Sequence, residues 1–70
     1  MSAGNYAAAL SSYEAALRCK VEEATLAKAF VVSCRLKNMA KAKHYYAKLP
    51  AAKQQTLVQV CIQQNLDPRP

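Results

Sequence analysis

The chain consists of segments with apolar residues at helical spacing, separated by short polar breaks. The most apolar segment, residues 21–36, has only Lys28 and Arg35 as a thin polar stripe, so a helix here must be covered on most of its surface. Narrower apolar stripes with spacings of three and four residues lie before and after it. The pattern predicts four helices, over residues 6–19, 22–37, 39–48 and 51–65, followed by a tail over residues 67–70.

Capping and breaking residues support these boundaries. Asn5 and Asn38 are suitable N-caps for the first and third helices. Pro50 ends the third helix and can serve as the first residue of the fourth. Short connections predict antiparallel neighbours in one all-α domain. The predicted core comprises Tyr6, Ala9, Leu10, Tyr13, Leu17, Leu26, Phe30, Leu36, Met39, Ala42, Tyr46, Leu57, Cys61 and Leu66.

The composition agrees with a folded helical chain. Of 70 residues, 53% are hydrophobic and only one is glycine, and no segment alternates apolar and polar residues as a half-buried strand would. The net charge is +6, and residues 35–53 contain six basic residues, His44 and no acid. This asymmetry could attract an acidic partner, although a solvated lysine-rich face explains it equally simply.

The three cysteines, Cys19, Cys34 and Cys61, are odd in number and widely spaced, with a single histidine in the chain. This spacing favours neither a zinc site nor a disulfide framework. It predicts reduced, partly buried thiols in a cytoplasmic protein. The sequence starts without a basic, apolar leader and has no run long enough to span a membrane, so we expect no membrane association.

Two parts of the chain match each other at an offset of 33 residues. The first reads Asn5-Tyr6-x-x-Ala9-x-x-x-Tyr13-x-x-Ala16, and the second reads Asn38-Met39-x-x-Ala42-x-x-x-Tyr46-x-x-Leu49. A fixed offset of this size is typical of helical-repeat arrays. A small alanine allows two helices to approach closely, and the aromatic residue one turn later fills the space beside it.

The stretch from Gly4 to Leu17 resembles the second helix of a tetratricopeptide repeat (TPR), and residues 37–46 resemble a second copy. The resemblance covers about residues 4–49. It implies that the helix over residues 22–37 is the first helix of the second repeat and that the last helix is a cap. The first helix of the first repeat is missing, which fits the terminal part of a longer TPR-like protein. The family implies a non-enzymatic module that binds a protein or peptide.

Three functions follow from these patterns. In the first, which the TPR resemblance implies, a partner protein or peptide contacts the surface formed by Lys28, Val31, Arg35, Gln55, Gln59 and Gln63. In the second, two copies associate through an uncovered flank of the first helix, formed by Tyr6, Leu10, Tyr13 and Leu17. In the third, nucleic acid is bound through Arg35, Lys37, Lys41, Lys43, His44, Lys48 and Lys53, with Tyr45 as a stacking ring.

Catalysis is not expected. His44 is the only histidine, is predicted to be exposed, and has no acid near it in the sequence to act as a positioned partner. With one glycine, the chain offers no glycine-rich phosphate loop. No metal or cofactor is therefore expected.

Overall fold

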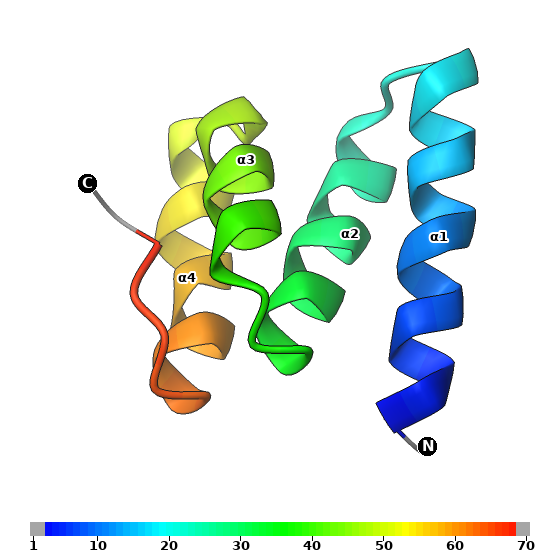
Figure 1. Cartoon of the computed structure of the whole chain (residues 1–70). Helices are drawn as coiled ribbons and strands as arrows, with labels where there is room; N and C mark the ends of the chain where they lie inside the picture. Colours follow the sequence, from blue (N-terminus) through cyan, green and yellow to red (C-terminus); the bar gives the residue numbers. More distant parts are fainter. Residues whose placement is uncertain (1–2, 69–70) are drawn as a thin grey trace.

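The computed structural model describes residues 3–68, which form four helices and no strand. These are α1 (Ala3–Cys19), α2 (Glu23–Arg35), α3 (Met39–Lys48) and α4 (Ala51–Gln63). Consecutive helices run antiparallel, and α2 lies between α1 on one side and α3 and α4 on the other (Figure 1). The all-α fold and the central position of the most apolar helix are as predicted. Within residues 3–68, none of the helices has the length and apolarity needed to cross a bilayer.

The N-terminal ends of the helices confirm one predicted cap and correct two others. The side chain of Asn38 accepts a hydrogen bond from the Lys41 amide at 3.1 Å, and α3 has the predicted bounds. Asn5 does not cap α1, because that helix begins two residues earlier, at Ala3. Pro50 lies in extended conformation as the N-cap of α4 rather than as its first residue.

Both α2 and α4 end two residues before the predicted position, for the same backbone reason. Lys37 and Asn65 have positive φ angles of 57° and 62°, and a left-handed residue ends an α-helix. The next amides, of Asn38 and Leu66, then donate back to the carbonyls of Ser33 and Cys61 at 3.0 and 2.9 Å. This Schellman arrangement satisfies carbonyls that the helix end leaves unpaired.

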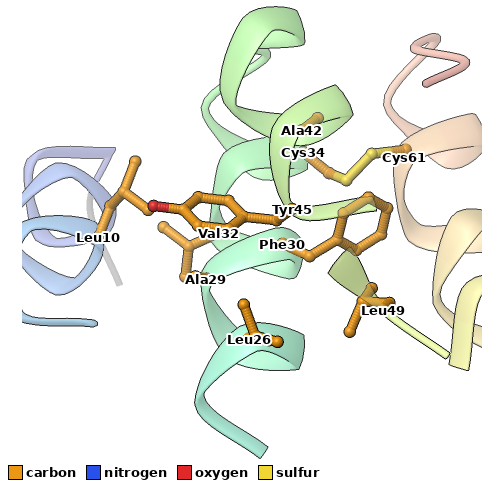
Figure 2. Packing of buried hydrophobic residues seen from close by; sticks show 10 residues of the cluster. All are labelled: Leu10, Leu26, Ala29, Phe30, Val32, Cys34, Ala42, Tyr45, Leu49 and Cys61. Atoms are coloured by element: carbon orange, nitrogen blue, oxygen red, sulfur yellow. A yellow bond between two sulfur atoms is a disulfide. The ribbon is translucent and has the colours of Figure 1, made fainter. Parts of the chain in front are cut away.

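The core forms around the side of α2 that faces α3 and α4. Phe30 and Ala29 have no exposed surface, and the ring of Phe30 lies 6.0 Å from that of Tyr46. Figure 2 shows Phe30 directed to the α4 side, and Tyr45 of α3 directed towards α1 on the other side of α2. The buried hydrophobic side chains are Leu10, Leu26, Ala29, Phe30, Val32, Cys34, Ala42, Tyr45, Leu49, Val58 and Cys61.

The predicted core was right in outline and incomplete in detail. Of the predicted residues, Leu10, Leu26, Phe30, Ala42 and Cys61 are buried, and the others are half-buried. Ala9 is half-buried whereas Ala42 is fully buried, because α1 packs on α2 alone and α3 packs on both α2 and α4. The prediction missed Val32, Cys34, Tyr45, Leu49 and Val58, among others.

The expectation of three reduced thiols is wrong for two of them. Cys34 of α2 and Cys61 of α4 form a disulfide, with their Cα atoms 4.7 Å apart, and both side chains are fully buried (Figure 2). Cys19 is exposed and free. The bond closes a loop that contains all of α3 and links α4 covalently to α2.

Candidate functional site

An apolar groove of about 320 Å³ lies on α2, between α1 and α4. It is lined by Tyr13 of α1, Leu57 of α4, and Ala27, Lys28, Val31 and Val32 of α2. We call these six residues the apolar groove. All are half-buried except Val32, which is buried, and Lys28, which is exposed. The groove therefore offers apolar contact area with one cationic group beside it.

The structure divides the predicted partner-binding set. Lys28 and Val31 line the apolar groove. Arg35 does not line it: its guanidinium carbon lies 5.9 Å from the centre of the Tyr6 ring, a cation–π contact between the end of α2 and the start of α1. Gln55, Gln59 and Gln63 are exposed on α4 but do not line the groove either.

The groove also contains three residues that were not predicted to bind a partner, namely Tyr13, Val32 and Leu57. Tyr13 and Leu57 were predicted to be core, and they are indeed half-buried, but one side of each borders the groove. Helical spacing groups residues on one face of their own helix. It does not show where three helices diverge enough to leave a groove.

The stripe predicted for self-association is partly exposed. Leu10 is buried at 6% exposure, and Tyr6, Tyr13 and Leu17 are half-buried against the core. The exposed side of α1 instead carries small residues, namely Ala7, Ala8, Ser11, Ser12, Ala15 and Ala16. Self-association through Tyr6, Tyr13 and Leu17 stays a prediction, whereas the buried side chain of Leu10 has little surface to contribute.

A polar cluster of Glu14, Lys41 and Tyr45 lies between α1 and α3. Lys41 and Tyr45 were assigned from the sequence to an exposed nucleic-acid surface. The hydroxyl of Tyr45 donates to Oε2 of Glu14 at 2.8 Å, and Lys41 Nζ pairs with the same oxygen. Tyr45 is 5% exposed, so it is a core residue rather than an exposed ring beside His44. Glu14 gives its buried hydroxyl a partner and links two helices that are otherwise separated by α2.

The cluster shifts the pKa of both Glu14 and Tyr45. The hydrogen bonds from Lys41 and Tyr45 hold the pKa of Glu14 below its ordinary value of 4.5. Burial, with the hydrogen bond to Glu14, raises the pKa of Tyr45 to about 12. Folding thus favours the carboxylate of Glu14 and the neutral phenol of Tyr45.

The contribution of Glu14 to stability is present at neutral pH and is lost as the pH falls through its lowered pKa. The contribution of Tyr45 is complete below about pH 10 and is lost as the pH rises towards 12.

This coupling predicts that the hydroxyl of Tyr45 ionises at unusually high pH. In an absorbance titration of tyrosinate, Tyr45 should ionise near pH 12, and Glu14→Gln should lower that pKa because the negative charge is gone. Tyr45→Phe should remove the late ionisation, whereas Tyr13→Phe should keep it. Circular dichroism followed in parallel reports whether the fold persists. The absence of a tyrosine ionisation near pH 12 in the folded chain would contradict the cluster.

The same cluster weakens the proposed nucleic-acid surface. Tyr45 cannot stack on a base because its ring is buried, and Lys41 is half-buried beside Glu14. The remaining predicted basic residues, Arg35, Lys37, Lys43, His44, Lys48 and Lys53, are exposed. They belong to α2, α3, α4 and the turn after α2 rather than to one stripe.

The described residues offer little that would support catalysis. Within residues 3–68, no three histidine, cysteine or acidic side chains gather as metal ligands would. Glu14 and His44 line the same pocket although they are far apart in the sequence. One carboxylate oxygen of Glu14, however, already accepts hydrogen bonds from Lys41 and Tyr45. The absence of catalysis stays a prediction.

Comparison of the chain with protein-family models, with curated proteins and with solved structures finds no match.

Proposed function

We propose that the chain is a non-enzymatic protein-interaction module that holds a short segment of a partner protein in the apolar groove. The observation that carries this proposal is the groove itself, which is lined by apolar side chains from three helices and by Lys28. Its volume is at the lower end of the roughly 300–1,000 Å³ typical of binding pockets, so it suits an apolar anchor of a peptide. The TPR resemblance supports the same assignment, because α2 would be a first helix and such helices face the partner.

The chemistry of the groove indicates which segment would bind. Apolar side chains of the partner would cover Val31, Val32 and Leu57, and Tyr13 would supply the kind of ring that often dominates binding energy. An acidic residue next to the anchor would complement Lys28 and, more generally, the charge of +6. The module would then form part of a longer TPR-like protein, with α4 as its cap.

Peptide display on the intact chain, followed by affinity measurements on the selected peptides, tests this site. We expect peptides with a large apolar residue beside an acid, and we expect Lys28→Glu to weaken their binding about tenfold, since an attractive pair becomes a repulsive one. Val31→Asp should weaken binding further by placing a carboxylate in the groove.

Lys53→Glu is the matched control, because Lys53 is an exposed lysine on α4 outside the groove. Arg35→Glu shows in addition whether the bound segment extends to the end of α2. Equal effects of Lys28→Glu and Lys53→Glu would mean that the peptides respond only to overall charge, and the groove would then not be the site.

A further inference from the structure

A second pocket, of about 390 Å³, lies away from the apolar groove, between the C-terminal end of α1, the α1–α2 connection and α3. Its apolar lining is Leu17, Val21 and Leu26, and its exposed basic lining is Arg18, His44 and Lys48. We call these six residues the basic pocket. The Glu14–Lys41–Tyr45 cluster completes it. Leu26 lies on the side of α2 opposite to Lys28 and Val31, since successive helical residues are about 100° apart, so the two sites face different directions.

The charges of the basic pocket are unbalanced towards the positive. Arg18, Lys41 and Lys48 contribute three cations against the single carboxylate of Glu14. Lys41 is the cation that Glu14 contacts directly, and the same carboxylate oxygen also accepts from Tyr45. Arg18 and Lys48, in the last turns of α1 and α3, are exposed and accessible to an anionic ligand.

The apolar part of the same pocket favours a ligand that carries an apolar group as well as an anionic one. Val21 is 67% exposed, more than any other large hydrophobic side chain among the described residues, and Leu17 and Leu26 line the pocket with it. A ligand that covers Val21 removes apolar surface from water while its anionic group meets Arg18 or Lys48. Nucleic acid fits less well, because the ring that could stack, Tyr45, is buried.

From this combination we infer that the basic pocket is a second peptide site, which binds an acidic segment carrying a large aliphatic side chain. The aliphatic side chain packs on Val21 and Leu17, and flanking carboxylates pair with Arg18 and Lys48. This site is independent of the apolar groove, and a module with both sites can hold two partner segments at once.

A short fluorescent peptide in which leucine alternates with glutamate is the probe for this site. Binding is measured by anisotropy on the full chain, with Val31→Asp present throughout so that the apolar groove does not contribute, and we expect the variant with Arg18→Gln and Lys48→Gln to lose about tenfold in affinity. The matched variant with Lys43→Gln and Lys53→Gln removes the same charge from exposed positions outside the pocket and should bind like the unchanged chain. Val21→Ser should weaken the leucine peptide and leave unchanged the weaker binding of a peptide with serine in place of leucine.

Several outcomes would overturn the inference. One is no measurable binding of the leucine–glutamate peptide. Another is an equal loss in the two double variants, which would indicate attraction to the whole basic chain. A third is a single-stranded oligonucleotide that binds more tightly than the peptide and depends on Arg18 and Lys48, which would assign the pocket to nucleic acid. Circular dichroism of each variant verifies that the helices are retained.

Discussion

Phe30→Ala is expected to reduce the free energy of unfolding by about 3–5 kcal/mol, the usual cost of removing a fully buried phenylalanine. Phe30 has no exposed surface, contacts the ring of Tyr46, and lies on the central helix to which the other three are packed. Native domains are stable by only about 0.05–0.15 kcal/mol per residue, so a chain of this size has little stability in reserve. We therefore expect the variant to be largely unfolded at room temperature.

Chemical denaturation followed by far-ultraviolet circular dichroism measures this effect. Phe30→Leu is the companion variant, because it fills more of the space and should stay folded with a smaller loss. Ile62→Ala is the control at a hydrophobic position that is 37% exposed, where we expect a change within about 1 kcal/mol. If Phe30→Ala is as stable as the unchanged chain, the packing around α2 described above is incorrect.

Reduction of the Cys34–Cys61 disulfide is expected to have the second largest effect. The bond joins residues separated by 27 positions. Closing a loop of this length removes unfolded-state entropy worth about 3.5 kcal/mol in the chain-entropy model. A reductant should therefore lower the denaturation midpoint strongly. The double variant with Cys34→Ala and Cys61→Ala should be destabilised even without reductant.

Thiol titration provides the direct control for that prediction. The unfolded, unreduced chain should show one reactive thiol, that of Cys19, and reduction should reveal the other two. Cys19→Ala should not change the stability, and reductant should have no further effect on the double variant. Three free thiols in the unreduced chain would rule out the bond. Stable disulfides are typical of oxidising compartments, so the predicted cytoplasmic location loses the support that it drew from reduced thiols.

The helices themselves could be predicted because each is encoded by its own residues. The three-and-four spacing of apolar positions, the Asn38 cap and Pro50 placed α3 within its observed bounds. The thin polar stripe of Lys28 and Arg35 identified α2 as the helix that must be covered on several sides, and it is. Errors at the ends of α2 and α4 came from Lys37 and Asn65, whose left-handed conformation no local pattern required.

The sites could be predicted only in part, because they depend on how the helices are rotated against one another. Spacing placed Lys28 and Val31 on one face of α2, and both line the apolar groove. It could not show that Tyr13 of α1 and Leu57 of α4 approach that face. In the same way, the many lysines of α3 predicted a wet surface around Tyr45, and only the nearby carboxylate of Glu14 explains why this residue can turn inward.

By itself, then, the sequence determined the number of helices, their order and the helix at the centre, since these follow from periodicity within short stretches. Tertiary structure alone decided that Cys34 meets Cys61, that Glu14 joins Lys41 and Tyr45, and where the groove and the basic pocket open. The physical reason is that the backbone of a helix by itself sets the angle between successive residues at about 100°. The rotation and distance between two helices are fixed only when all of their contacts are made together.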